Sequence, residues 1–283
     1  MLRSVPSALD KTRHSAPRTL LKDHSDLMNR VRFLPSILLA TTVFMTSPSS
    51  AQSPSLGDLD FQETFRILAS AAPTLNLDVL ETALLAAGCA QQNSIAKRQI
   101  LSIVDYSRPS TERRLWVFDL EKRTLLFHEL VAHGVNTGEN MATRFSNIEG
   151  SRQSSLGLFL TDQTYVGRNG YSLKLQGLEL NINHLALERT IVMHGAWYVS
   201  DAFHREHGRL GRSWGCPAVT EAIARPLIDT IKDGSLLFVY YPDERWLANS
   251  YFLNACSQNS SEVSSSLSSG ISQGAPVTST GVE

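Results

Sequence analysis

The chain has almost no net charge and only three cysteines. Its 26 Lys and Arg residues nearly balance 27 Asp and Glu residues, for a formal net charge of −1. The sequence contains no basic patch interleaved with aromatic residues, no glycine-rich phosphate-binding loop and no internal repeat. These absences argue against a nucleic-acid partner and against a nucleotide cofactor. We therefore expect neither.

The sequence also lacks an apolar run long enough to span a bilayer as a helix. Its most apolar stretch, residues 33–45, follows two arginines and precedes a segment of small residues. This pattern is typical of a secretory signal in residues 1–51, cleaved after Ala51. Met28 would begin a signal of more ordinary length and is the alternative start. An uncleaved anchor is the alternative to cleavage; after cleavage we expect no stable membrane insertion.

Two segments with apolar residues at helical spacing, 59–72 and 76–91, come next. They predict an N-terminal helical segment over 52–98, followed by a β-rich domain over 99–256. Residues 257–283 are rich in Ser, Gly and Thr and have almost no large apolar groups. Such a tail cannot offset its ordering entropy, so we expect it to be disordered.

Short β-like runs dominate the chain from about residue 100. They are 100–107, 114–120, 124–133, 157–167, 171–178, 189–196 and 235–242. One helix is expected among them, over 220–234, which Pro226 should break or restart. Many strands and few helices predict an α+β fold, dominated by a mostly antiparallel sheet in the form of a β-sandwich or a barrel.

The run "RSWGCPAV" places Cys216 between a glycine and a proline. Gly215 permits a backbone conformation that a side chain would forbid, and a helix is predicted shortly afterwards. Main-chain N–H groups near Cys216 could therefore face an incoming carbonyl oxygen, as a cysteine nucleophile requires. A turn cysteine without chemistry is the alternative. In an exported protein a free thiol favours the reactive role.

A cysteine nucleophile needs a base that titrates near neutral pH, which a histidine provides. His194 ends a β-like run and precedes Gly195, so it lies where a strand meets a loop. His204 and His207 lie between His194 and Cys216. These four side chains could also hold zinc, but the spacing does not match "HExxH" or a paired-cysteine site. We expect no metal.

The run "VMHGAWYV…GRSWGCPAV" resembles the catalytic signature of the murein L,D-transpeptidases, a family with the YkuD-like fold. The resemblance extends over roughly residues 100–242 and includes "ATRFSN", "SSLGLF" and "LKLQGLE". It implies that Cys216 is the acyl-accepting nucleophile and His194 its base, with the carbonyl of Gly195 orienting the imidazole. It also implies that Ser213 and Gly215 line the cysteine and that the turn supplies oxyanion donors.

The chain departs from the commoner signature at two positions. Trp214 stands where that signature has histidine, and Ala218 stands where it has a polar residue. Trp214 could supply an apolar wall or a stacking surface for the substrate. Arg209 and Arg212 are candidates for binding a substrate carboxylate, because a guanidinium binds carboxylates in a bidentate manner. Solvated loop charges are the alternative for both arginines.

The implied substrates are peptidoglycan stem peptides, and the implied location is the periplasm or cell wall. Cys216 would attack a stem-peptide carbonyl to form an acyl-enzyme. An amine acceptor would then give a cross-link, and water would give carboxypeptidase or endopeptidase activity. A murein-binding domain without turnover is a further alternative.

The odd cysteine count suggests a pairing. A disulfide between Cys89 and Cys256 would leave Cys216 as the free thiol in an oxidising compartment. The spacing alone does not establish this bond, and three unpaired thiols are the alternative.

Overall fold

The computed structural model describes residues 56–254 and Cys256, all within one unit that spans Ser53–Glu283. The predicted signal region (1–51) and the predicted disordered tail (257–283) lie outside the described residues. Within the described part of the chain, no helix has both the length and the apolar character needed to cross a membrane.

The described residues form eight strands and five helices. The strands are β1 (Ile100–Asp105), β2 (Arg113–Asp119), β3 (Thr124–Ala132), β4 (Gly157–Gly167), β5 (Gly170–Gly177), β6 (Val192–Gly195), β7 (Ala218–Val219) and β8 (Leu236–Tyr240). The helices are α1 (Leu56–Ala71), α2 (Leu77–Gln92), α3 (Asp201–His207), α4 (Glu221–Ile231) and α5 (Glu244–Asn249).

The strands close into a barrel in the order β1-β2-β3-β7-β6-β5-β4-β8, with β8 returning to β1. Two neighbouring pairs, β1 with β8 and β6 with β7, are parallel, and the other pairs in this order are antiparallel. The predicted α+β, mostly antiparallel fold is confirmed, and the sheet takes the barrel form. Closure removes the exposed strand edges that an open sheet would present.

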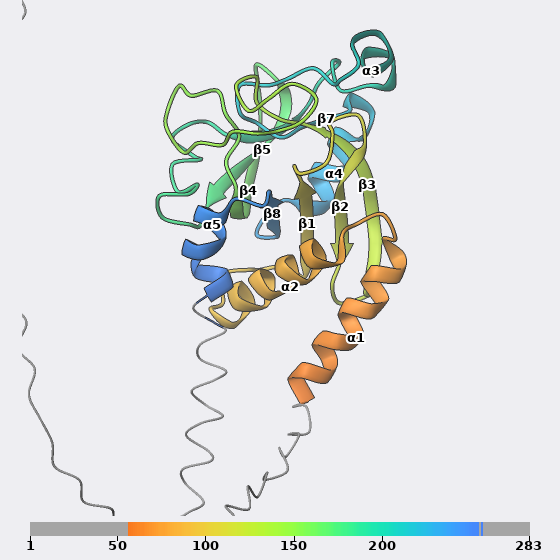
Figure 1. The fold of residues 1–283 in the computed structure, drawn as a ribbon, viewed down its shortest axis with the longest axis vertical. Coiled ribbons are helices and arrows are strands. Elements are labelled where there is room, and N and C mark those ends of the chain that lie inside the picture. Colours follow the sequence, from red (N-terminus) through yellow and green to blue (C-terminus); the bar gives the residue numbers. More distant parts are fainter. Residues whose placement is uncertain (1–55, 255, 257–283) are drawn as a thin grey trace, which may run out of the picture. The chain divides into compact units, whose positions relative to one another are not determined.

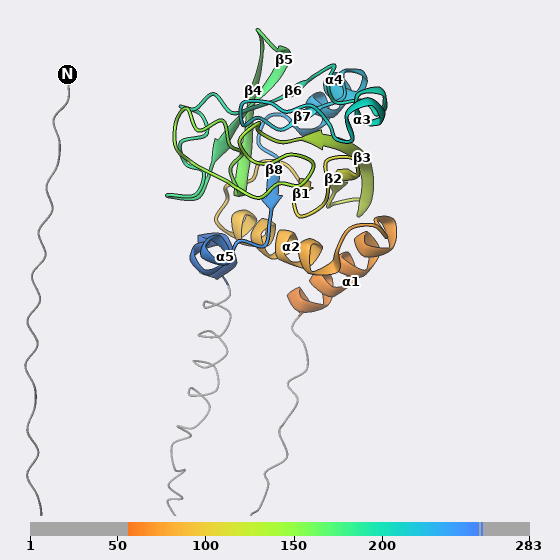
Figure 2. The ribbon, with the colours of Figure 1, turned by 45° about the horizontal axis from the view of Figure 1, so that its top comes forward.

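The two predicted N-terminal helices are present and lie together at one end of the barrel, whereas β7 and α3 lie at the other (Figures 1 and 2). The side chain of Asn76 begins α2 by accepting hydrogen bonds from the main chain of Asp78 (2.8 Å) and Val79 (3.3 Å). The buried face of α2 packs on β1 and β8 and shares their hydrophobic core. The residues of β1 are all buried, since the barrel interior and α2 cover both of its faces.

Helix α4 corrects one expectation. It runs without a break over Glu221–Ile231 with Pro226 inside it. Proline removes one intrahelical hydrogen bond, but the buried side chains of Leu227, Ile228 and Ile231 hold this face of the helix on the barrel core. Tertiary packing therefore maintains a helix that the local sequence disfavours.

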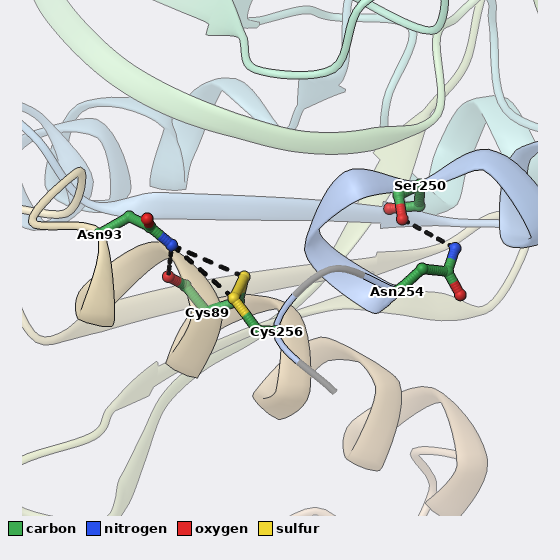
Figure 3. Close-up of a disulfide and its surroundings, with 5 residues drawn as sticks. All are labelled: Cys89, Asn93, Ser250, Asn254 and Cys256. Carbon is green, nitrogen blue, oxygen red and sulfur yellow. Dashed lines mark hydrogen bonds between the residues drawn. A yellow bond between two sulfur atoms is a disulfide. The ribbon is translucent and has the colours of Figure 1, made fainter. Parts of the chain in front are cut away.

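A disulfide joins Cys89, near the end of α2, to Cys256, which follows α5 (Figure 3). Their Cα atoms are 5.6 Å apart, and the bond closes a sequence separation of 167 residues. The side-chain amide of Asn93 donates to the carbonyl of Cys89 at 2.8 Å beside the bond. Because α2 and β7 lie at opposite ends of the barrel (Figure 1), the disulfide is remote from the strand that follows Cys216. Cys216 is the free cysteine.

Candidate active site

Strands β6 and β7 bring the predicted base and nucleophile into one region. His194 in β6 is paired with Ala218 in β7, and these two strands are parallel. Cys216 lies two residues before Ala218, beside the start of β6. There the main-chain N–H of Val192 donates to the Cys216 sulfur at 3.5 Å. The two side chains therefore come from adjacent positions on neighbouring segments of the barrel.

The imidazole of His194 is buried and fixed by its own backbone. Its Nδ1 lies 2.9 Å from the carbonyl oxygen of Gly195. A carbonyl only accepts, so this contact places the proton of a neutral imidazole on Nδ1 and leaves Nε2 as the acceptor. Burial lowers the pKa of His194 below its ordinary value, with the Gly195 contact opposing the shift. The group is therefore a neutral base at neutral pH.

The Cys216 thiol is also buried, with 8% of the residue exposed. Burial raises the pKa of the Cys216 thiol, whereas the Val192 N–H and the charge of Arg189 lower it. The thiol donates toward the carbonyl of Thr190 across 3.7 Å. Within the described residues it makes no hydrogen bond to His194. In this arrangement the Cys216 sulfur is therefore protonated at neutral pH.

The turn before Cys216 is closed by a single hydroxyl. Ser213 Oγ donates to the carbonyl of Cys216 at 2.6 Å and accepts from the N–H of Gly215 at 3.1 Å. Gly215 has φ +118°, and a Cβ there would lie 2.8 Å from the carbonyl oxygen of Gln153. A side chain at this position would therefore be both strained and obstructed. The Gly215 N–H is bonded to Ser213, whereas the N–H groups of Trp214 and Cys216 have no such partner among the described residues.

Sequence reasoning missed the contacts that hold this turn in place, which come from His133–Gly134 and Ser154. Gly134 forms an isolated parallel bridge with Ser213, whose N–H donates to the carbonyl of His133 at 3.0 Å. The buried Ser154 hydroxyl accepts from the Gly134 N–H (3.0 Å) and donates to the carbonyl of Gly215 (3.1 Å). The sequence held a signal, because His133–Gly134 repeats the His-Gly step of His194–Gly195.

His133 is nevertheless unsuited to act as a base. Arg114 donates to its Nδ1 (2.8 Å), and its Nε2 lies 3.3 Å from the carbonyl of Gly138. Burial and the positive charge of Arg114 lower the pKa of His133 to about 3. Both ring nitrogens are occupied and the ring stays neutral, so His133 holds structure in place.

Trp214, Arg209 and Arg212 are the other predicted residues of the segment that leads to Cys216. Trp214 is 66% exposed, and the guanidinium of Arg152 stacks on its ring with the Cζ atom 4.5 Å from the centroid. Arg209 and Arg212 both form ion pairs with Glu139, at 3.0 and 2.6 Å. A substrate carboxylate would have to compete with Glu139 for either arginine. Their predicted role in substrate binding stays a prediction.

The two other histidines of the predicted set lie on α3. His207 packs edge-on against Phe203, with ring centroids 4.1 Å apart, and His204 belongs to the same short helix. Among the described residues, no three His, Cys, Asp or Glu side chains gather as a metal site would require. The zinc alternative thus gains no support.

A cavity of about 580 Å³ lies elsewhere on the described surface. It is lined by Phe145, Ser146, Asn147, Leu156, Leu180, Asn181, Ile182, Asp243, Arg245, Trp246 and Asn249. None of the predicted site residues contributes to its wall. It carries no argument for the reaction.

A comparison with models of protein families shows to which family the chain belongs. The family model of the L,D-transpeptidase catalytic domain matches residues 71–240, more than half of the chain. The chain belongs to this family. The match begins at the end of α1 and includes α2. No curated protein sequence matches the chain.

Solved L,D-transpeptidases are among the structures similar to this family member. One from Mycobacterium smegmatis is 12% identical with a TM-score of 0.32, covering 50% of this chain and 59% of its own. One from Stackebrandtia nassauensis is 14% identical with a TM-score of 0.31, covering 65% and 92%. The helical cell shape determining protein Pgp2 from Campylobacter jejuni is 10% identical with a TM-score of 0.36, covering 68% of each chain. This chain therefore spans a little over half of the mycobacterial protein.

Proposed function

We propose that the chain is an exported cysteine acyltransferase that acts on peptidoglycan stem peptides, with Cys216 as nucleophile and His194 as base. The contact between His194 Nδ1 and the Gly195 carbonyl carries this proposal. It leaves Nε2 free to accept a proton, and Cys216 lies two residues before Ala218, the strand partner of His194. The family, whose members are L,D-transpeptidase catalytic domains, supports the substrate class.

The first half-reaction transfers the acyl group to the enzyme. Rotation of the Cys216 side chain away from Thr190 brings the thiol to His194 Nε2, which takes its proton as the sulfur attacks the stem-peptide carbonyl. The Cys216 N–H stabilises the oxyanion, because the Gly215 N–H already donates to Ser213. The tetrahedral adduct then expels the terminal D-amino acid, whose amine receives the proton from His194. A thioester at Cys216 remains.

The second half-reaction regenerates the thiol. An amine of another stem peptide attacks the thioester, gives its proton to His194 and forms the new amide, while Cys216 leaves and is reprotonated. Water in place of the amine gives carboxypeptidase or endopeptidase activity. The buried site favours an acceptor that displaces water as it binds. Amine transfer is therefore the proposed main reaction, and hydrolysis is the second candidate.

The substrate is proposed to lie against Trp214. Its exposed ring, already stacked on Arg152, offers a flat apolar surface within the turn that Ser213 closes. Arg209 and Arg212 can take a substrate carboxylate only by exchange with Glu139. Peptidoglycan lies outside the cytoplasmic membrane, which agrees with the predicted export signal in residues 1–51 and a location in the periplasm or cell wall.

Mass spectrometry tests this function. The purified protein is incubated with a tetrapeptide stem, with and without a second stem as acceptor, and both the products and the intact protein are weighed. We expect a thioester adduct on the peptide that contains Cys216 and a cross-linked dimer. Cleaved stems without dimers would establish hydrolysis instead. A protein that binds stems but forms no adduct would be the binding domain without turnover.

A further inference from the structure

Arg189, three residues before β6, has an unusual set of partners. Its guanidinium donates to the carbonyls of Ser146 (2.7 Å) and Gln153 (2.7 Å) and to the hydroxyls of Ser155 (2.5 Å) and Ser151 (3.2 Å). These acceptors are all neutral. Its Nε is buried and has no hydrogen-bond partner in the described part of the chain. The side chain is thus a half-buried cation without a carboxylate.

Burying such a cation costs free energy of desolvation unless a negative charge offsets it. The ionised sulfur of Cys216 would supply that charge. Arg189 donates to the carbonyl oxygen of Gln153, and the same oxygen lies 2.8 Å from where a Cβ of Gly215, the neighbour of Cys216, would stand. Burial lowers the pKa of Arg189, and the negative charge of Cys216 raises it. In return, the charge of Arg189 lowers the pKa of the Cys216 thiol against the effect of burial. The interaction is mutual and forms only when the sulfur is ionised.

The other groups that face the sulfur supply no fixed charge. Burial raises the pKa of both Tyr106 and Tyr198 to about 12, and the charge of Cys216 contributes to each shift. Both phenols are therefore neutral in the pH range of catalysis. His194 is neutral at rest, and Val192 contributes only its main-chain N–H. Among the described residues, Arg189 is thus the permanently charged side chain whose charge acts on the thiol.

The chain geometry after Arg189 supports the same relationship. Thr190 has φ +54°, a left-handed conformation that is uncommon for a β-branched residue. In this conformation its carbonyl accepts a hydrogen bond from the Cys216 thiol, with 3.7 Å between oxygen and sulfur. When the thiol loses its proton, this hydrogen bond is lost and the carbonyl dipole becomes unfavourable. A nearby cation compensates for that loss.

We propose that Arg189 is a positioning residue whose guanidinium stabilises the Cys216 thiolate, while its hydrogen bonds hold the segment 146–155 behind the catalytic turn. This role rests on the proposed nucleophile but is separable from turnover. As the proton passes from Cys216 Sγ to His194 Nε2, the new negative charge develops beside a guanidinium that is already oriented. No reorganisation of solvent is then needed.

The experiment measures the pH dependence of iodoacetamide alkylation of the intact, unreduced protein. With Cys89 and Cys256 joined, Cys216 is the thiol that reacts. Arg189→Gln keeps some hydrogen bonding but removes the charge. We expect it to raise the apparent thiol pKa by about one unit, which slows alkylation roughly tenfold at a fixed pH below that pKa. Arg189→Lys, which keeps the charge, should leave the apparent pKa within a few tenths of a unit.

Two controls separate charge from structure. Ser151→Ala removes one hydrogen bond of Arg189 and keeps its charge, so the thiol pKa should not move. Arg98→Met removes another half-buried guanidinium that donates to carbonyls, those of Thr230 and Lys232, and should also have no effect. Arg189→Met is the second neutral variant should the Gln variant fail to fold.

Two results would overturn the proposal. One is an unchanged thiol pKa in a folded neutral variant. The other is an equal shift in Arg189→Lys or Ser151→Ala, which would assign the effect to loop structure. Because alkylation needs no stem peptide, this readout stays valid even if the wild-type protein forms no acyl-enzyme. Failure of the proposed function would thus be seen separately, in the mass-spectrometry experiment.

Discussion

The Nδ1 of His194 and the carbonyl oxygen of Gly195, its neighbour in the chain, lie 2.9 Å apart. This contact needs no third side chain, because the backbone of β6 itself orients the ring. It fixes the tautomer that leaves Nε2 free and holds the ring in one orientation on β6. The proposed catalytic pair therefore depends on strand geometry more than on a carboxylate partner.

The first prediction concerns the pair itself. Cys216→Ala should abolish acylation by a stem peptide or a carbapenem, and His194→Ala should slow it on the order of 10²-fold or more. The rate of adduct formation is followed by intact-protein mass spectrometry, and circular dichroism checks folding. Measurable turnover by Cys216→Ala would disprove the assignment of the nucleophile.

The second prediction concerns the histidines of α3. His204→Ala and His207→Ala, tested singly, should each acylate much faster than His194→Ala, since both belong to a short helix and not to β6 or the catalytic turn. The same adduct assay measures all three variants side by side. A loss at either position as large as that at His194 would move the base to α3.

The third prediction is a pH profile. Acylation requires a neutral imidazole, so its rate should fall as the pH drops through the pKa of His194. Burial places this pKa below the ordinary value of 6.5. The rate should thus stay level from neutral pH down past 6.5 before declining. A carbapenem acylation series measures it, and a midpoint above 6.5 would contradict the buried neutral base. Ionisation of the Cys216 thiol should not increase the rate below pH 9.0, the ordinary pKa of a thiol, because burial raises the pKa of this one.

The fourth prediction concerns the disulfide. Cys89→Ser should lower the free energy of unfolding by roughly 2–4 kcal/mol, because the bond constrains a long loop of the unfolded chain. Urea unfolding measures the difference, with Cys216→Ser as the matched control that leaves the bond intact. Thiol titration of the unfolded, unreduced protein should find one free thiol, at Cys216. Three free thiols, or a bridge that includes Cys216, would refute the pairing.

The fifth prediction concerns Ser154, which is buried between two main-chain groups. Ser154→Ala leaves the N–H of Gly134 and the carbonyl of Gly215 without their partner. The expected cost is about 1–3 kcal/mol in unfolding free energy, together with slower acylation. Thr230→Ala removes an exposed hydroxyl bonded to Pro226 and should change stability by no more than about 0.5 kcal/mol. Equal effects of both variants would contradict the role of Ser154.

Much of the fold was predictable from local patterns. The apolar periodicity of 59–72 and 76–91 matched α1 and α2, and the seven predicted β-like runs each overlap a strand. Strand β7 was not predicted, because a strand of two residues is too short to show an alternation of apolar and polar residues. Helix α3 was also missed, since none of its residues is buried and so no apolar face marks it.

Some features of the candidate site were likewise predictable from the sequence, and others were not. The "SWGCP" turn is local, so its glycine and cysteine could be read directly from the sequence, and the same is true of the His194–Gly195 step. The contacts that Arg189, His133 and Ser154 make could not, because they join segments that only the folded chain brings together, although the His133–Gly134 step and the "SSLGLF" run are visible in the sequence. Glu139 likewise pairs with Arg209 and Arg212 across a separation that no sequence pattern encodes.

The order of residues was therefore enough to predict most of the helices and strands and the turn around Cys216, since propensity, periodicity and turn chemistry act over a few residues. Closure of the barrel decided which segments became neighbours. It set β6 against β7 and placed Gly134 beside Ser213, and it brought the half-buried Arg189 close enough for its charge to lower the pKa of the Cys216 thiol. Burial then shifted the pKa values of His194 and Cys216, because the cost of a charge depends on what surrounds it in space and not on its neighbours in the chain.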